Sequence, residues 1–412
     1  MKRVCESSGD RITNLPADVL QRILVLLPIK DAIKTATLST KWRREWKSIP
    51  HLVIDDNFAV QKGCPSQPTQ AITMIDESLL PNIYKVLMLH NGPITKFELS
   101  ISRFFIGPSH QNAMDQIILH LSDHRGLSLS ELSLVSLAAQ VYKLHSALFS
   151  CLHISRLRLS HCELRQPSWF VGFSKLRVLE LSTVTLPADF FENFLHKCPV
   201  LETLKVSVCP GTPSNLEIAT PCLQEFCFSG CFKRICFKST PLLKLVSIHK
   251  RSVYVENPQD MAAFFASLPA LQRFSAEGYL IGYLAAAGAA NNIPIRLPNP
   301  LHQLKSLELN KLYLGSLMNV RVFSCLIMSS PNLVELRIKR LKEFEFREIH
   351  GVRVELDLVG FVLASAPLLE KVHITPVGRL EPGKVFGFMK EVMQYKRASK
   401  EAEVIYAGRY EG

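Results

Sequence analysis

The 412-residue chain has few aromatic residues, 8% of the total, and only three of them are tryptophan. Its longest apolar run, Tyr279 to Ala290, covers roughly 12 residues, whereas a transmembrane helix needs ~20. The N-terminus carries two positive charges without an apolar stretch behind them, so we expect no secretory signal. There is no Asn-x-Ser/Thr sequon, and the eleven cysteines are an odd number. These absences predict reduced thiols and a protein of the cytoplasm, the nucleus or both.

The sequence also lacks the short motifs that carry well-known chemistry. It has no Walker loop, Gly-x-Ser-x-Gly elbow, His-Glu-x-x-His helix or Gly-x-Gly-x-x-Gly turn. Its 13 histidines do not cluster at ligand or triad spacing. Cys222, Cys227, Cys231 and Cys236 lie close together, but they do not form the two separate couples that zinc sites favour. We therefore predict no metal, no cofactor and no enzymatic activity.

The charge of the chain is positive, at +12, which favours acidic partners without naming one. The basic residues are spread along the chain, and their densest group lies between Lys30 and Lys47. Such a group is more typical of the solvated side of short helices than of a nucleic-acid patch.

The N-terminal segment predicts a small helical module. Pro16 suits the start of a helix, and Pro28 stops that helix about three turns later. The apolar stripe of this helix is wider than a surface helix usually shows; it consists of Val19, Leu20, Ile23, Leu24, Leu26 and Leu27. A second helix face carries Leu38, Trp42 and Trp46 at every fourth position. About 40 residues cannot cover this much apolar surface, so the module presents a binding face or docks on the rest of the chain.

The order of residues in this module is more specific than its composition. It runs Leu15-Pro16-x-Asp18-Val-Leu-x-x-Ile23-Leu, then Leu26-Leu27-Pro28-Ile-Lys-Asp31-Ala, then Leu38-Ser39-x-Lys41-Trp42-Arg43-x-x-Trp46. This pattern resembles the F-box, in particular its plant branch, whose modules bind a Skp-type adaptor that bridges to a cullin. The resemblance implies that the adaptor contacts are Leu15, Pro16, Leu20, Ile23, Leu24, Leu27, Pro28, Leu38 and Trp42. Sequence leaves open which of them face the adaptor and which hold the helices together.

A second pattern, Leu-x-x-Φ-x-Φ with Φ apolar, recurs through the rest of the chain. Clear copies are Leu176–Leu181, Leu201–Val206, Leu223–Phe228, Leu243–Ile248, Leu271–Ala276, Leu304–Leu309, Leu333–Ile338 and Leu369–Ile374, and weaker ones start at Ile94, Leu129 and Ile154. Their starts are roughly 20 to 36 residues apart, whereas leucine-rich repeats run about 20–29, so the longer copies must hold insertions. Proline stands two residues before many copies, often after an apolar stretch, which predicts a unit of helix, proline and strand.

Stacked units of this kind predict an α/β fold in which a small three-helix F-box precedes a leucine-rich-repeat solenoid. Parallel strands would line its concave face and helices its convex face. The residue between the two Φ positions would then point outward. That column reads Glu98, Ser133, Arg158, Glu180, Lys205, Cys227, Ser247, Ser275, Glu308, Arg337 and His373. Its charges are mixed, which argues against a nucleic-acid groove. We expect Arg158, Glu180, Lys205, Arg337 and His373 to contact a target protein.

The C-terminal stretch carries a further resemblance. Leu358 to Ile374, followed by Tyr395-Lys-Arg-Ala-Ser-Lys-Glu-Ala-Glu-Val404, is similar to the FBD region that follows leucine-rich repeats in plant F-box proteins. We therefore expect the following organisation: a flexible tail over 1–9, the F-box over 10–50, a linker and the start of the solenoid over 51–93, leucine-rich repeats over 94–340, and an FBD-like region over 341–412 that caps the solenoid.

Together these resemblances imply the substrate-recognition subunit of an SCF-type (Skp-cullin-F-box) E3 ubiquitin ligase. The F-box would bind the Skp adaptor and the repeats would bind a target protein, with no membrane involved and no chemistry performed by the chain itself. The alternative is a leucine-rich-repeat scaffold for protein interaction without a ligase role. A nucleic-acid-binding repeat protein driven by the positive charge is a third hypothesis, and it would require binding that falls steeply with salt.

Overall fold

The computed structural model describes residues 15–59, 78–101, 110–123, 128–136, 141–187, 189–212, 215–250, 260–286, 293–310, 317–339, 343–349, 353–376 and 382–406. The predicted tail 1–9, the first residues of the predicted F-box and part of the predicted linker 51–93 lie outside these ranges. The chain divides into two compact units. Unit 1 comprises residues 1–203 and 208–211, and unit 2 comprises residues 204–207 and 212–412.

Unit 1 begins with the predicted helical module. Its helices are α1 (Ala17–Val25), α2 (Ile29–Lys34) and α3 (Thr40–Glu45), with short 3₁₀ turns η1 (Thr35–Thr37) and η2 (Trp46–Ser48). Pro16 and Pro28 stand at the N-caps of α1 and α2, where a missing N–H costs little. Ser39 caps α3 by accepting a hydrogen bond from the backbone N–H of Trp42 at 3.4 Å. The two prolines and the serine therefore set where the three helices begin.

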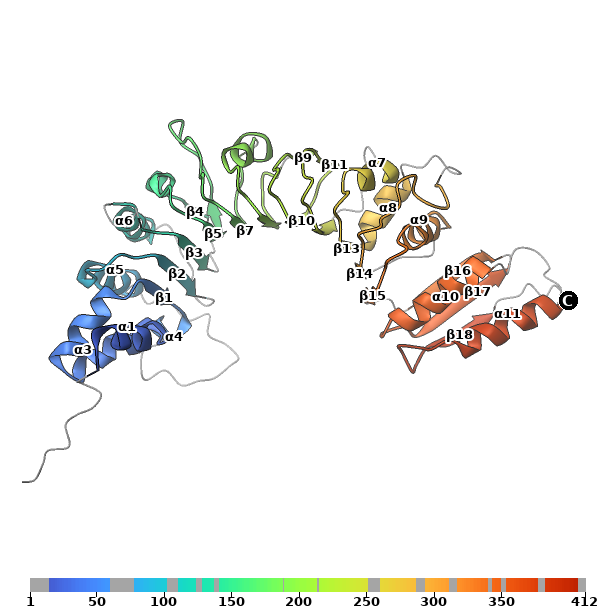
Figure 1. Ribbon diagram of the computed structural model, residues 1–412, viewed down its shortest axis with the longest axis horizontal. Coiled ribbons are helices and arrows are strands. Elements are labelled where there is room, and N and C mark those ends of the chain that lie inside the picture. Colours follow the sequence, from blue (N-terminus) through green and yellow to red (C-terminus); the bar gives the residue numbers. More distant parts are fainter. Residues whose placement is uncertain are drawn as a thin grey trace, which may run out of the picture. The chain divides into compact units, whose positions relative to one another are not determined.

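The repeats of unit 1 contribute one parallel strand each to a single sheet (Figure 1). In order across the sheet these are β1 (His51–Ile54), β2 (Lys96–Ile101), β3 (Glu131–Ser136), β5 (Arg156–Ser160) and β7 (Val178–Ser182). The helical elements that follow these strands in the chain are α4 (Asp56–Ala59), α5 (Leu79–Leu89), α6 (Gln111–Ser122), η4 (Ser146–Ser150), η5 (Phe190–Phe194) and η6 (Leu195–Lys197). A small parallel pair, β4 (Tyr142–Lys143) with β6 (Cys162–Glu163), completes the unit. Strand β1 follows the F-box directly and was not predicted from the repeat pattern.

The F-box is joined to the first repeat by close backbone contacts. Backbone N–H groups of Asn91 and Gly92 donate to the Lys47 carbonyl at 2.7 and 3.2 Å. The buried imidazole Nε2 of His90 lies 2.8 Å from the Ile49 carbonyl oxygen. Strand β1 then pairs with β2 from His51 onward. The F-box helices and the first repeats therefore share one folded unit.

Unit 2 continues the repeat pattern with its own parallel strands. These are, in order, β8 (Thr203–Ser207), β10 (Glu225–Gly230), β12 (Leu245–Lys250), β13 (Arg273–Glu277), β14 (Ser306–Asn310) and β15 (Glu335–Lys339). The other side of these repeats holds the parallel pair β9 (Asn215–Ile218) and β11 (Arg234–Phe237) and the helices α7 (Met261–Ala266), α8 (Gly278–Ala286) and α9 (Leu317–Met328). Edge-to-face phenylalanine pairs lie in the interior, as Phe226 with Phe237 and Phe264 with Phe274 illustrate.

The C-terminal part of unit 2 forms a separate three-stranded parallel sheet. It orders β16 (Glu343–Ile349), β17 (Lys371–Pro376) and β18 (Glu403–Tyr406), with α10 (Arg353–Ser365) and α11 (Pro382–Gln394) between them. Arg353 of α10 forms an ion pair with Glu391 of α11. The backbone N–H of Ala398 donates to the Leu363 carbonyl at 2.8 Å, which ties the chain after α11 to α10.

Burial alternates along the repeat strands as the Leu-x-x-Φ-x-Φ pattern predicts. In β8 and β13, for example, the second and fourth residues are buried and the residues between them are not. The predicted α/β fold, with an N-terminal helical module followed by parallel repeat strands, is confirmed. No helix within the described ranges combines the length and the hydropathy needed to cross a bilayer. We call the face of each repeat sheet that carries no helices the open face.

Candidate protein-binding sites

The F-box exposes an apolar surface, which we call the F-box patch. Leu26 is 83% exposed and Leu38 is 61% exposed, although both are large aliphatic side chains. Ile23, Leu27, Pro16 and Pro28 are exposed as well. Leu26 and Leu27 occupy the turn between α1 and α2, and Leu38 lies in the turn before α3, where the helices are too short to cover them. An exposed cluster of this kind on a small module is typical of an interface.

The structure divides the predicted adaptor residues into two groups. Pro16, Ile23, Leu27, Pro28 and Leu38 are exposed, and Leu15 is half-buried. Leu20, Leu24 and Trp42 are at most 3% exposed, so in this chain they hold the helices together. Leu26 was absent from the predicted set although it is the most exposed residue of the apolar stripe. Leu26 lies within the apolar stripe on the helical wheel, but periodicity alone does not show which side of a wide stripe is covered by other residues.

Trp42 forms the core of the module rather than its surface. Its indole N–H is buried and has no hydrogen-bond partner among the described residues. The neighbouring Lys41 ammonium donates to the Leu15 carbonyl and so fixes the start of the module against α3.

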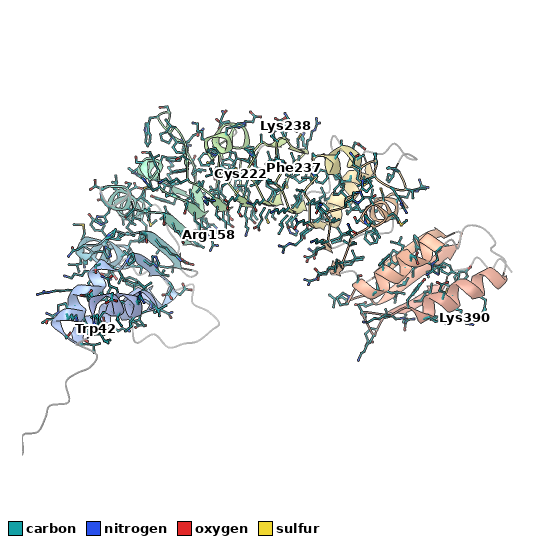
Figure 2. All side chains as sticks on the ribbon, viewed as in Figure 1. Trp42, Arg158, Cys222, Phe237, Lys238 and Lys390 are labelled. Atoms are coloured by element: carbon teal, nitrogen blue, oxygen red, sulfur yellow. The ribbon has the colours of Figure 1, made fainter. Side chains whose placement is uncertain are left out.

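The predicted target-binding charges on the open face are largely paired with each other or with neighbours. Arg158 and Glu180 face each other across β5 and β7, and Arg158 Nε donates to Glu180 Oε2 at 2.7 Å. Figure 2 shows Arg158 extending from β5 on the side away from the helices of unit 1. Lys205 lies 3.2 Å from Glu225, and Arg337 lies 2.5 Å from Glu335. Exposed pairs of this kind contribute little to stability, but each leaves less charge available to a partner.

His373 does not share a sheet with the other four predicted residues. It lies on β17, in the three-stranded sheet with β16 and β18, whereas Lys205 and Arg337 lie on β8 and β15 of the repeat sheet. The prediction of one continuous column that includes His373 is therefore wrong. The reason is that the chain forms the additional strand β16 after β15, and β17 pairs with that strand.

A group of a serine, a histidine and a glutamate lies on the open face of unit 2 and was not predicted as a site from the sequence. Ser247 and His249 project from β12, and Ser247 Oγ lies 3.0 Å from His249 Nε2. His249 Nδ1 lies 3.9 Å from Glu277 Oε1 of the adjacent strand β13. The strand register places His249 beside Glu277 because Ser247 stands opposite Ser275. The two-residue spacing of Ser247 and His249 was the sequence signal, but the partner carboxylate depends on register.

This serine–histidine–glutamate group has the order of a catalytic triad, but its surroundings do not favour catalysis. β12 pairs with β10 on one side and β13 on the other, so the N–H groups of its ladder point along the sheet plane and are used in pairing. An oxyanion needs preorganised donors aimed at it, and paired strand amides do not provide them. The arrangement is suited to hydrogen bonding and charge recognition instead.

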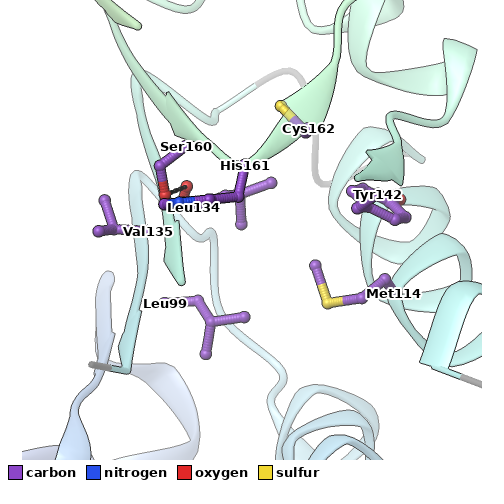
Figure 3. A pocket seen from close by; sticks show the side chains of 8 residues that line it. All are labelled: Leu99, Met114, Leu134, Val135, Tyr142, Ser160, His161 and Cys162. Atoms are coloured by element: carbon purple, nitrogen blue, oxygen red, sulfur yellow. Dashed lines mark hydrogen bonds between the residues drawn. The ribbon is translucent and has the colours of Figure 1, made fainter. Parts of the chain in front are cut away.

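A small cavity lies inside unit 1. It measures about 10 Å³ and is lined by Leu99, Met114, Leu134, Val135, Tyr142, Ser160, His161 and Cys162 (Figure 3). Such a volume holds at most one water molecule, whereas pockets for small ligands are ~300 Å³ or larger. Burial, together with a 2.9 Å hydrogen bond to Asp115, raises the pKa of Tyr142 and keeps it protonated. Burial also raises the pKa of Cys162 to about 12.

The cysteines within the described ranges are free thiols, and none of them belongs to a group of metal ligands. Burial raises the pKa of Cys151 to about 11 and that of Cys198 to about 12, so these thiols stay protonated. In the described part of the chain, no three His, Cys, Asp or Glu side chains gather as metal ligands would.

Three protein-family models match parts of the chain. The chain matches the F-box domain over residues 12–53, the repeats described as "FBD-associated F-box protein At5g56370, LRR repeats" over residues 120–338, and the FBD over residues 332–374. The Arabidopsis thaliana F-box/FBD/LRR-repeat protein At1g13570 is 30% identical, and the alignment covers 97% of this chain and 99% of that protein. The Arabidopsis FBD-associated F-box protein At5g56370 is 22% identical over 96% of this chain and 100% of its own. A solved leucine-rich-repeat protein of Leptospira interrogans, LIC12759, matches with a TM-score of 0.35 at 12% identity, covering 86% of this chain and 95% of its own.

The helical module followed by parallel repeat strands defines a leucine-rich-repeat protein with an N-terminal F-box. The chain belongs to the family of F-box/FBD/LRR-repeat proteins. The resemblances inferred from the sequence are thereby confirmed. F-box domains generally bind Skp1-type adaptors, and proteins of this family are typically non-catalytic and act through protein interaction.

Proposed function

We propose that the chain is the target-binding subunit of an SCF-type ubiquitin ligase, in which the F-box patch binds a Skp-type adaptor. The observation that supports this most strongly is the exposure of Leu26 and Leu38 on the F-box. Complete burial of a leucine side chain contributes about 1.5–3 kcal/mol. Covering these two residues alone would therefore give several kcal/mol toward binding, before Ile23, Leu27 and the two prolines are counted.

The junction between the F-box and the repeats supports a positioning role. The contacts of Asn91 and Gly92 with Lys47, and of His90 with Ile49, hold the F-box against the first repeat. An adaptor bound to the F-box would consequently hold the open face of unit 1 in a fixed position. A subunit of this kind acts by raising the effective concentration of its target near the conjugating enzyme, and it needs no catalytic group of its own. The adaptor would link the chain to a cullin, in the cytoplasm, the nucleus or both.

Co-elution of purified components tests this proposal. The full-length chain is mixed with a Skp-type adaptor and a cullin, and size-exclusion chromatography reports whether the three migrate together. We expect Leu38→Asp to remove the chain from the complex, because Leu38 is exposed in the F-box patch. Leu242→Asp is the matched control, since Leu242 is 46% exposed in unit 2 and lies outside the F-box. If the folded wild-type chain elutes apart from the adaptor, the ligase role fails and an interaction scaffold takes its place.

A further inference from the structure

The open face of unit 2 carries an ordered array of side chains between β10 and β14. The register places Cys227, Ser247, Ser275 and Glu308 side by side across four strands. The row on one side consists of Glu225, Leu245, Arg273 and Ser306. The row on the other side consists of Ser229, His249, Glu277 and Asn310, where His249 and Glu277 are neighbours by their 3.9 Å contact. All of them project from the face opposite the buried apolar residues.

Three of the four side chains in the central row are short, and the fourth is Glu308 of β14. The short ones are the hydroxymethyl groups of Ser247 and Ser275 and the mercaptomethyl group of Cys227. Arg273 stands on one side of this row, and His249 with Glu277 stands on the other. Arg273 and Glu277 are four residues apart on one strand, which corresponds to roughly 13 Å. The result is a row of hydroxyl and thiol groups with a cation on one side, a carboxylate on the other, and the Glu308 carboxylate at its β14 end.

Arg273 differs from the other cations of the open face. Arg158, Lys205 and Arg337 each lie within ion-pair distance of a glutamate. The Arg273 guanidinium is exposed and makes no ion pair or side-chain hydrogen bond with the described residues. Its five N–H donors are therefore available to an anionic group of a partner.

The opposite end of the site holds a histidine and a carboxylate. His249 Nε2 lies 3.0 Å from the Ser247 hydroxyl oxygen, and His249 Nδ1 lies 3.9 Å from a carboxylate oxygen of Glu277. The Glu277 side chain is 16% exposed and lies beside His249, so its carboxylate is largely desolvated. A partly desolvated carboxylate favours a cationic group with N–H donors.

We infer that this site binds an extended segment of a target protein that carries an acidic and a basic side chain at positions i and i+4, with a small residue between them at i+2. In an extended chain these three side chains share one face and repeat at the spacing of β13 itself. The acidic group binds Arg273, the basic group binds Glu277, and the small residue lies on the Ser247 and Ser275 hydroxyls. The inference rests on the proposed role of the repeats in holding a target protein.

Fluorescent synthetic peptides and the full-length chain test the inference directly. One peptide has glutamate, serine and lysine at i, i+2 and i+4; a second has glutamate at both ends, and a third has lysine at both ends. Fluorescence anisotropy should show the mixed-charge peptide binding about tenfold or more tightly than either like-charged peptide, since each loses one charge-assisted contact. Equal binding of all three peptides, or no binding of any, would overturn the inference.

Charge-reversal variants show whether the selectivity arises at this site. Arg273→Glu should come to prefer the lysine–lysine peptide, and Glu277→Lys should come to prefer the glutamate–glutamate peptide. Arg337→Glu is the matched control on the same face and should leave the preference for mixed charge intact. If the control switches preference as Arg273→Glu does, binding reflects the general charge of the face and the inference is wrong.

Two further readouts separate this inference from other accounts. Adaptor co-elution of the wild-type chain reports the F-box independently, so absence of adaptor binding with retained peptide selectivity would refute the ligase role and leave this site standing. A fluorophosphonate reagent should not label Ser247. Labelling that disappears in His249→Ala would overturn the inference by showing that the group is nucleophilic.

Discussion

Replacement of Gly92 by alanine is expected to weaken the junction between the F-box and the repeats. A Cβ atom at this position would lie 2.8 Å from both the Cα and the carbonyl oxygen of Ser48, and 3.0 Å from its carbonyl carbon. These neighbours are backbone atoms, which cannot rotate away as the end of a flexible side chain would. The clash must therefore move the end of the F-box relative to the first repeat.

Two contributions determine how far Gly92→Ala lowers the free energy of unfolding. Introducing a methyl group into a filled space typically costs 1–3 kcal/mol. The same shift lengthens the hydrogen bonds from Asn91 and Gly92 to Lys47, each worth about 0.5–1.5 kcal/mol. We expect the free energy of unfolding to fall by about 2 kcal/mol or more, which lowers the melting temperature of a unit of about 200 residues by roughly 4–8 °C.

Gly387→Ala is the matched control for this change. Gly387 lies in α11, and a Cβ there would meet no atom within 4 Å. The same substitution should therefore stabilise the helix by about 0.5–1 kcal/mol, because alanine has the higher helix propensity. Hydrogen exchange of the full chain should show faster exchange in the F-box and first repeat for Gly92→Ala, and slower exchange in α11 for Gly387→Ala. An unchanged or stabilised Gly92→Ala variant would refute the close-contact account of the junction.

The other predictions concern the core, the thiols and one turn. Leu24→Ala should destabilise unit 1 by about 2–5 kcal/mol because Leu24 is fully buried. Leu26→Ala should change the stability by less than about 0.5 kcal/mol because Leu26 is exposed. Chemical denaturation of the two variants measures both changes in the free energy of unfolding. Iodoacetamide should modify the exposed Cys231 in the native chain and leave Cys162 unmodified until unfolding, as peptide mass spectrometry would report. Burial raises the pKa of the Cys162 thiol from 9.0 to about 12. Burial of the neutral thiol therefore contributes fully to stability below pH ~9, and this contribution is lost as the pH rises toward 12. A free energy of unfolding that stays constant over this range would contradict the burial of Cys162. Gly172→Ala should lower stability by more than about 1 kcal/mol, since its φ of 134° is rarely open to other residues.

The sequence predicted the repeat fold well because its signals are local. Leucine spacing and proline positions determine where each strand begins, and these features require no knowledge of neighbouring repeats. The additional strands β1 and β16 also carry the pattern, as Ile49-x-x-Leu52-x-Ile54 and Leu341-x-x-Phe344-x-Phe346. They were missed because the first directly follows the F-box and the second starts only eight residues after the copy at Leu333, well short of one repeat. Strand β16 also explains why His373 belongs to a different sheet from Arg337.

The sites were less predictable because they depend on burial and register. Periodicity placed Leu24 and Leu26 on one wide stripe, yet the structure buries the first and exposes the second. Arg158 and Glu180 were predicted as separate contacts, but strand register joins them into an ion pair. The proximity of His249 to Glu277 likewise follows only from the alignment of two strands 28 residues apart in sequence, about one repeat.

Calorimetric titration of the full-length chain with a purified Skp-type adaptor tests the central claim most directly. We predict saturable binding that Leu26→Asp weakens by about tenfold or more, since a leucine buried at the interface contributes roughly 1.5–3 kcal/mol and a buried carboxylate adds a penalty. Ile295→Asp, at a residue 79% exposed in unit 2, should bind as the wild type does. Absence of binding by the folded wild-type chain, or equal binding by Leu26→Asp, would contradict the assignment of the F-box patch as the adaptor site.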